Sequence, residues 1–253
     1  MECTNVSIAI YALIAATPVN ALAQASSDAW AFEATPYFWA AGSSGWARIG
    51  ARTPAVNLDA SFSNVWRNLD FGAMGTFEAR KGRWGIIVDM IYIDLSTTSD
   101  PLAGGALGTV RLKANQAIVQ AAGAYRVLDS PTTPVDVLAG VRYTHLDSST
   151  TLSSSRLLPN GDSHSDSVGW TDGFAGVRAA FAWTERWSIV GYADVGAGGT
   201  KLSWQLLGSI NYNVSKTFVA KAGYRVISMN YDQSKFLYDI KTAGPFIGVG
   251  IRF

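Results

Sequence analysis

The sequence predicts a closed, antiparallel, up-and-down transmembrane β-barrel of about 10–12 strands. Most of the chain after residue 23 alternates apolar and polar residues with a period of two, as strands with two different faces do. Short polar turns also alternate with longer polar loops along the chain. Finally, the last six residues, GVGIRF, continue the strand pattern to the end of the chain, where polar residues are more common.

The composition limits the class of protein. Charged residues make up 15% of the 253 residues, well below the roughly 25% of typical domains, and the mean hydropathy is +0.13. A net charge of +1 gives no reason to expect nucleic acid as a partner. With one cysteine (Cys3) and two histidines, the chain predicts no metal site and no cofactor.

The N-terminal segment predicts secretion. An apolar run from Val6 to Ala16 is followed by Ala21-Leu22-Ala23, which is typical of a signal peptide over residues 1–23 that is cut before Gln24. The run is too short to cross a bilayer, and no later run of about 18 apolar residues predicts a transmembrane helix. Residues 24–253 therefore form the expected barrel domain.

Ten strands are expected from the alternation. In residues 69–80 one face carries Leu69, Phe71 and Phe77, and that apolar face is expected to point outward. The segment 42–68 is open to an extra hairpin, which would raise the strand count by two, and to a short helix within 62–70 that is N-capped by Ser63 and caps or plugs one end; an ordinary loop turn is the alternative to the helix. The expected strands are 30–41, 69–80, 84–96, 107–127, 134–147, 166–183, 187–199, 201–214, 217–231 and 236–253.

The connections predict which end of the barrel is which. Those at 81–85, 128–136, 183–188 and 213–218 are short, whereas 147–167 is long and rich in Ser, Thr, Asp and Gly. Short periplasmic turns and long extracellular loops are the layout of an outer-membrane barrel. Trp84, Trp183 and Trp187 lie at the short turns, where such a barrel has an aromatic girdle.

The charged face of the strands is expected to line the lumen, because it carries too many charges for a dry core. We expect its acids and bases to pair across a narrow, partly wet interior, or alternatively to line a narrow channel that selects solutes. A secreted β-sandwich with this face in water is the competing fold. The expected luminal residues are Glu33, Glu78, Arg80, Asp89, Arg126, Asp136, Arg142, Asp172, Arg178, Asp194, Lys221, Arg225 and Arg252.

The last strand and three earlier segments resemble those of known proteins. The last strand is expected to pair with the first strand and to direct Ile247, Val249, Ile251 and Phe253 toward lipid. Such an ending after a signal peptide resembles the sorting signal that the barrel-assembly machinery recognises in Gram-negative outer-membrane proteins. The segments TPYFWAAG (35–42), NLDFGAMGTFEARKGRWG (68–85) and YIDLS (92–96) resemble a family of small proteobacterial outer-membrane β-barrel proteins of unassigned function.

The resemblance implies location in the cell outer membrane, with outer-membrane lipid and lipopolysaccharide as surroundings and the assembly machinery as partner. It implies no ligand and no activity. The first functional hypothesis is a non-enzymatic, porin-like envelope protein with a structural role or narrow solute passage through the charged lumen. The alternatives are a small-solute channel and a rim enzyme that acts on lipid A or another envelope lipid.

His145 is the weak candidate for the catalytic residue of such an enzyme. Asp147 and Ser148 lie close to it in sequence, which is the minimum that a nucleophile, base and orienting acid require. The plainer interpretation of His145 is a rim residue in the headgroup zone. About 10–12 strands enclose far less space than the 16–18 strands of an aqueous porin, so a wide pore is not expected.

Overall fold

The fold is seen in a computed structural model, which describes residues 29–49, 54–100, 108–155, 159–233 and 236–253. The expected signal peptide, residues 1–23, lies outside the described residues. Within those ranges, no helix has the length and apolar character needed to cross a membrane.

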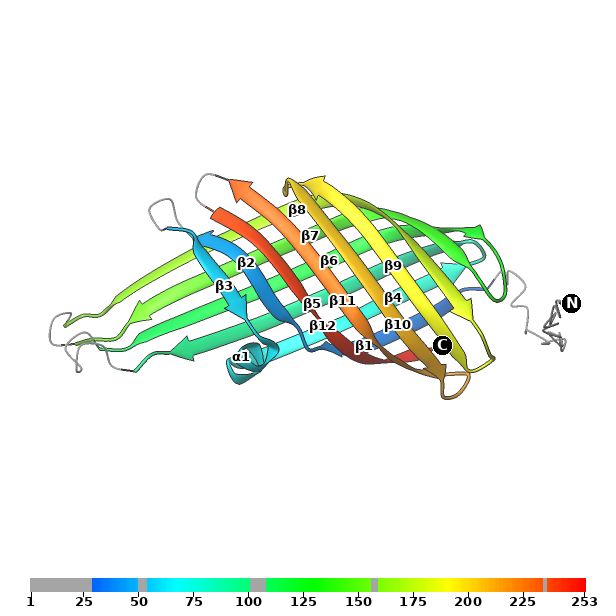
Figure 1. The fold of residues 1–253 in the computed structure, drawn as a ribbon, viewed down its shortest axis with the longest axis horizontal. Coiled ribbons are helices and arrows are strands. Elements are labelled where there is room, and N and C mark those ends of the chain that lie inside the picture. The colour runs from blue at the N-terminus through cyan, green and yellow to red at the C-terminus, as the bar shows by residue number, and fades with distance from the viewer. Residues whose placement is uncertain (1–28, 50–53, 101–107, 156–158, 234–235) are drawn as a thin grey trace, which may run out of the picture.

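Ten antiparallel strands form a closed ring, which confirms the predicted barrel (Figure 1). The ring runs from β1 to β4 and then in chain order to β12, which pairs back with β1. Two further strands, β2 and β3, extend from β12 outside this ring. The elements are β1 (Ala31–Trp39), β2 (Gly42–Ile49), β3 (Val56–Ala60), α1 (Phe62–Arg67), β4 (Leu69–Lys81), β5 (Trp84–Thr98), β6 (Val110–Leu128), β7 (Val135–Leu152), β8 (Asp162–Ala182), β9 (Trp187–Gly198), β10 (Leu202–Asn213), β11 (Phe218–Gln233) and β12 (Phe236–Arg252).

The last residue takes part in closing the ring. The backbone N–H of Phe253 donates to Phe32 O, and the N–H of Phe32 donates to Phe253 O, both at 3.1 Å. Their rings stack with centroids 5.6 Å apart. We call this end, where β1 begins and β12 finishes, the turn end, because the short connections 82–83, 129–134, 183–186 and 214–217 lie there; the opposite end is the loop end.

The wall of the barrel is interrupted on one side. β2 continues the path of β1 beside β12, but β2 takes β3 as its other neighbour. β4 pairs with β1 only through Gly75–Arg80, so residues 69–74 of β4 are paired with β5 alone among the described residues. We call the stretch of wall between β3 and residues 69–74 of β4 the seam.

A break between β1 and β2 causes this interruption. The N–H of Ala40 donates to Pro245 O at 2.8 Å, and the indole of Trp39 donates to Gly244 O at 3.0 Å. A Cβ at Gly244 would lie 2.1 Å from Ala40 O, so only glycine allows the backbone of β12 this close to the break. The predicted extra hairpin is therefore present, but it leaves the ring at ten strands.

The predicted short helix is confirmed as α1, but its position differs from the expectation. Ser61 is the N-cap, with its Oγ accepting from the N–H of Asn64 at 3.4 Å, so the expectation of Ser63 was wrong. The rings of Phe62 and Trp66 pack edge-on against the outward-facing Phe38, with centroids 6.1 and 5.5 Å away. α1 therefore lies against the side wall beside the seam and does not plug an end (Figure 1).

The outer surface of the ring is apolar, as the strand pattern predicts. One correction concerns Leu69, which a register irregularity between Leu69 and Phe71 turns inward, onto the side of Gly72. At the turn end, Trp84 packs on Tyr125 and Trp187 on Tyr212. Exposed outward side chains include Phe77, Ile86, Val119, Val141, Val177, Phe181, Ile189, Val195, Leu206, Ile210, Phe218, Tyr224, Ile247, Val249 and Phe253.

Candidate functional site

The interior of the barrel changes character along its length. On β11 the inward side chain of Arg225 is followed toward the loop end by Ile227, and on β5 Asp89 is followed by Ile91. All four are buried. The half of the lumen near the turn end is therefore charged, and the half near the loop end is apolar.

The charged half contains a compact cluster of three arginines and two acids. Arg178 lies 2.7 Å from Glu78 and 2.8 Å from Asp136. Arg80 lies 3.1 and 2.8 Å from the same two acids, and Arg126 lies 3.0 Å from Asp136. Four different strands supply these five side chains, so their pairing joins opposite parts of the ring across the lumen.

A smaller group lies beside the closure of the ring. Glu33 of β1 pairs with Lys221 of β11 and, at 2.9 Å, with Arg252 of β12. Arg252 Nη1 also donates to Asn213 Oδ1 at 3.1 Å. The charged residue near the end of the chain is thus one of the side chains that connect the last strands to the first.

Arg225 forms one side of a layer in the middle of the lumen. Its guanidinium donates to Asp89 at 2.5 Å, to the Tyr37 hydroxyl at 2.7 Å and to Gln205 at 2.7 Å. The Tyr37 hydroxyl in turn donates to Asp89 at 2.8 Å. The guanidinium carbon lies 5.4 Å from the centre of the Trp39 ring, so polar contacts and an aromatic face enclose it together.

Arg142 forms the other side of this central layer. Its Nη2 lies 2.6 Å from Asp194 Oδ2, and its Nε donates to Gln120 at 3.0 Å. The Tyr192 hydroxyl donates to the same carboxylate at 2.6 Å, and the guanidinium lies 5.0 Å from the centre of the Phe174 ring. This ion pair is shielded from solvent on all sides.

Asp172 differs from the other expected luminal charges. It lies opposite Arg142 in the pairing of β7 with β8, yet no ion pair joins the two among the described contacts. Its Oδ1 accepts the backbone N–H of Thr200 at 2.7 Å, and Oδ2 is buried without a hydrogen-bond partner. Asp172 therefore holds the tight turn between β9 and β10 instead of joining the charge network.

Two cavities lie on either side of the central layer. The charged one, of about 300 Å³, is lined by Glu78, Arg178 and Lys221 among others, and the apolar one has about 320 Å³. Tyr37 lines both. The central layer, formed by Arg142, Asp194, Arg225, Asp89, Tyr37, Gln205 and Gln120, thus stands between a polar and an apolar compartment.

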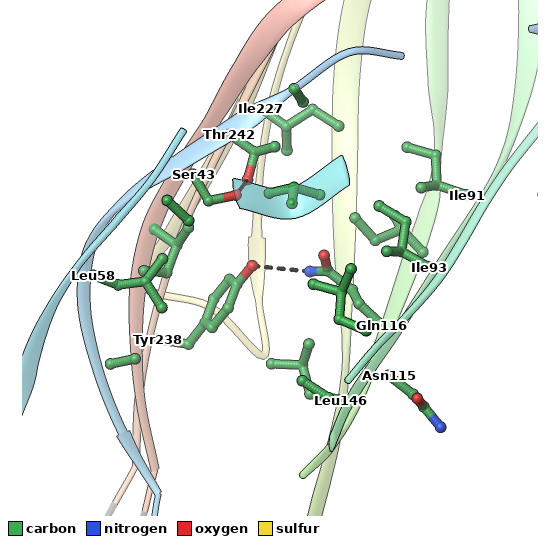
Figure 2. A pocket seen from close by; sticks show the side chains of 18 of the residues that line it. Ser43, Leu58, Ile91, Ile93, Asn115, Gln116, Leu146, Ile227, Tyr238 and Thr242 are labelled. Carbon is green, nitrogen blue, oxygen red and sulfur yellow. Dashed lines mark hydrogen bonds between the residues drawn. The ribbon is translucent and has the colours of Figure 1, made fainter. Parts of the chain in front are cut away.

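Aliphatic side chains from many strands converge on the apolar cavity (Figure 2). Two pairs of polar groups at its wall are hydrogen-bonded: Gln116 Nε2 donates to the Tyr238 hydroxyl at 2.9 Å, and Ser43 and Thr242 share a hydrogen bond of 3.0 Å. The side chain of Asn115 points away from the cavity (Figure 2). Its apolar lining includes Leu58, Met74, Ile91, Ile93, Ile118, Leu146, Val168, Ile227 and Met229.

This arrangement has the properties of a binding site for an apolar molecule. Cavities that hold small ligands have volumes of about 300–1,000 Å³ and mostly apolar walls with a few polar groups. The apolar cavity lies at the lower end of that range. Most of its wall is apolar, which is a favourable environment for a hydrocarbon group. The lining also includes the charged Arg48, Asp147 and Asp166, and Arg48 Nε is buried without a hydrogen-bond partner.

The region around His145 does not assemble a nucleophile. His145 Nε2 lies 3.1 Å from Asp147, and Nδ1 lies 3.4 Å from the Tyr143 hydroxyl. Both ring nitrogens thus have partners, and neither partner is a serine. His164 lies 2.8 Å from Asp166 in an exposed position. Across the described ranges, no group of three or more His, Cys, Asp or Glu side chains is placed to hold a metal.

Comparisons with known proteins assign no family to this chain. No protein-family model matches the sequence, and no curated protein matches it. Among solved structures, the chain is similar to the outer membrane protease OmpT of Escherichia coli (9% identity, 90% of this chain and 98% of that chain, TM-score 0.49). It is also similar to Ail of Yersinia pestis (15%, 88% and 98%, 0.40) and to a major outer membrane protein of Thermus thermophilus (15%, 89% and 100%, 0.42).

At TM-scores below 0.5 these likenesses carry no argument about function. The barrel rests on its own strand pairing, which closes from β12 to β1. The resemblance to small outer-membrane β-barrel proteins is thereby confirmed at the level of fold.

Proposed function

We propose that this protein is a non-enzymatic outer-membrane barrel that binds an apolar small molecule in the loop-end half of its lumen. The observation that carries the proposal is the apolar cavity of about 320 Å³, which lies inside a barrel whose other half is charged. An interior that served only to hold the barrel together would gain most from close packing, because unfilled apolar space lowers stability.

The central layer supports binding over free passage. Arg225 and Arg142 are almost fully buried, and each guanidinium is held by an acid and a glutamine. Moving either side chain aside would leave a buried charge without its partner, which costs several kcal/mol. A molecule in the apolar cavity is thus supported from below by a layer that resists opening.

The membrane assignment is part of the same proposal. The exposed band of Phe, Ile, Val and Leu side chains requires an apolar surrounding, for which we propose outer-membrane lipid and lipopolysaccharide. We propose the barrel-assembly machinery as the partner that inserts the chain, with Ile247, Val249, Ile251 and Phe253 as the signal. Fractionation of the expressed protein, with gel migration compared before and after boiling, tests both statements.

Equilibrium dialysis of naphthalene against the protein in bilayer discs tests the binding site. Discs that carry Ile91→Gln serve as the comparison, because their lipid dissolves the same amount of naphthalene as the lipid of discs with the wild type. Ile91 lines the apolar cavity, and Ile87, two inward positions nearer the turn end on the same strand, lines the charged cavity. Ile87→Gln is therefore the matched control.

We expect discs with the wild type or Ile87→Gln to hold about one more naphthalene per barrel than discs with Ile91→Gln. Equal uptake by all three proteins would refute the binding site. Loss of binding in both variants would mean that the effect arises from general disturbance of the barrel and would also count against it.

Narrow passage of small solutes is the second candidate function. The charged cavity of about 300 Å³ favours it, because it contains both signs of charge and lies directly beneath the central layer. In this candidate the ion pairs of the central layer would be the barrier. Single-channel conductance in planar bilayers separates this candidate from simple binding.

A further inference from the structure

The seam gives the apolar cavity a side exit. The residues that line the cavity include Leu58 and Ala60 of β3, Leu69 and Met74 of β4, and Val65 of α1. These elements border the stretch of wall in which β3 and β4 are not paired. The cavity thus reaches from the middle of the lumen to the place where the wall is interrupted.

The rim of this interruption is apolar. The rim side chains from β3, α1 and β4 named above carry no charge and no hydrogen-bonding group. A water-filled opening would favour polar side chains, and these five positions provide none. The rim is therefore suited to hydrocarbon on both its inner and outer sides.

The seam also continues into the lipid-facing surface. Next to it lie Phe38 and Trp66, which pack on each other with ring centroids 5.5 Å apart and remain exposed, and Phe71 of β4, which is 57% exposed. α1 contributes no buried residue to the barrel. Exposed apolar side chains of β1, α1 and β4 thus lie next to the residues of β3, α1 and β4 that line the cavity.

We propose that the seam is a lateral opening through which one hydrocarbon chain of a bilayer lipid enters the apolar cavity. This inference rests on the proposed apolar binding site. It adds that the bound molecule comes from the surrounding membrane. A chain that enters sideways stays in contact with apolar groups throughout, whereas a water-borne molecule must first approach through the polar loop end. A lipid chain that moves from the bilayer into the cavity passes from one apolar surrounding to another, so it enters at little cost.

A photoreactive lipid can detect this chain inside the barrel. The full protein is placed in vesicles of phosphatidylcholine that carries a diazirine in one acyl chain, irradiated, and its adducts are mapped by mass spectrometry. Ile93 and Ile227 report on the cavity, and the outward-facing Val119 reports on ordinary lipid contact. Ile87, in the charged cavity, should receive no adducts.

Gly72 provides a variant that narrows the seam. A Cβ there would be in ordinary van der Waals contact with the Leu69 side chain at 3.7 Å and with Tyr92 O at 3.8 Å, so the backbone tolerates a side chain at this position. Gly72→Trp fills the opening from β4, and Leu58→Trp fills it from β3. Gly208→Trp is the control for an added tryptophan, because Gly208 lies on the outward face of β10, which does not border the seam, and a Cβ there meets nothing within 4 Å.

We expect adducts on Ile93, Ile227 and Val119 in the wild type and in Gly208→Trp. In Gly72→Trp or Leu58→Trp, labelling of Ile93 and Ile227 should fall at least fivefold while labelling of Val119 and uptake of naphthalene stay constant. Because both positions also line the cavity, loss of naphthalene uptake in these variants would mean that the new side chain fills the cavity itself, and the fall in labelling would then count against the lateral opening. Adducts confined to Val119 in the wild type would overturn the lateral opening, and so would interior labelling that both seam variants leave unchanged. If naphthalene still binds in those cases, the cavity binds apolar molecules but fills from the loop end; if it does not, the proposed function fails as well.

Discussion

Arg142 and Asp194 form an ion pair of 2.6 Å in the middle of the lumen, and neither side chain is exposed to solvent. They come from β7 and β9, which are not neighbours in the ring, since β8 lies between them. The pair therefore joins two strands that share no backbone hydrogen bonds. Together with Arg225 and Asp89, this ion pair separates the charged half of the lumen from the apolar half.

Breaking this pair should strongly destabilise the barrel. We expect Asp194→Ala to lower the free energy of unfolding by about 3–5 kcal/mol, because it leaves Arg142 charged and buried without its carboxylate. Urea-induced unfolding of the protein in vesicles measures this change. Lys201→Met, which removes an exposed pair with Asp232, is the control and should leave the unfolding midpoint in place. A midpoint for Asp194→Ala equal to that of the control would contradict this description of the central layer.

Removing the barrier in the central layer should create a conducting path. We expect Arg225→Ala combined with Asp89→Ala to raise single-channel conductance in planar bilayers at least tenfold over the wild type, because it connects the two cavities without leaving a charge unpaired. Arg252→Ala, at the turn end, is the control and should leave conductance unchanged. A wild-type current as large as that of the double variant would show that the central layer is no barrier.

Two variants of Phe253 test how this residue closes the ring of strands. They distinguish the contribution of its backbone hydrogen bonds from that of its side chain. Phe253→Ala retains the two hydrogen bonds to Phe32 and loses the ring stack, whereas deletion of residue 253 loses both. We expect both to lower the yield of heat-modifiable barrel in the outer membrane, and the deletion to lower it further. Normal yield for the deletion would contradict a role of this residue in assembly.

Replacing His145 tests the enzyme alternative. Because both ring nitrogens are held by Asp147 and Tyr143, we expect His145→Ala to leave the barrel folded and the composition of lipid A unchanged, as measured by mass spectrometry of the extracted lipid. A change in lipid A with the barrel intact would revive the rim enzyme. Overexpression of the wild type is the comparison, since an enzyme would then increase its product.

Alternation alone was sufficient to predict most of the strands and their outward faces. β11 shows why: exposed Phe218 and Tyr224 alternate with inward Lys221 and Arg225, so the two faces differ in polarity. The failure at Leu69 also has a local cause. An irregularity in the pairing of β4 with β5 shifts the register there, and no residue in the sequence marks it.

The apolar cavity could not be foreseen from alternation, because both faces of the relevant strands are apolar. On β5, inward Ile91 and Ile93 alternate with outward Met90 and Tyr92, so the difference in polarity that marks the lumen elsewhere disappears. A run of apolar residues on both faces near the loop end of a barrel strand was the available signal. The seam was equally hidden, since the path of β3 is decided by the break at Ala40 and the glycine at 244.

The sequence also could not predict which acid pairs with which base in the charged lumen. Arg142 is directly opposite Asp172 in the pairing of β7 with β8, which would suggest that these two interact. The guanidinium instead crosses to Asp194, and Asp172 accepts the N–H of Thr200. Which acid meets which base depends on the tilt of the strands and on side-chain reach, neither of which the alternation records.

The most direct test of the account is to observe an apolar molecule in the apolar cavity by methyl NMR. The protein, labelled at isoleucine methyl groups, is titrated with naphthalene in discs of deuterated lipid. We predict saturable shifts and contacts to naphthalene at Ile93 and Ile227, and none at Ile87 in the charged cavity. Contacts confined to outward-facing residues such as Ile189 and Ile210 would show that naphthalene only dissolves in the lipid around the barrel, and would contradict the account.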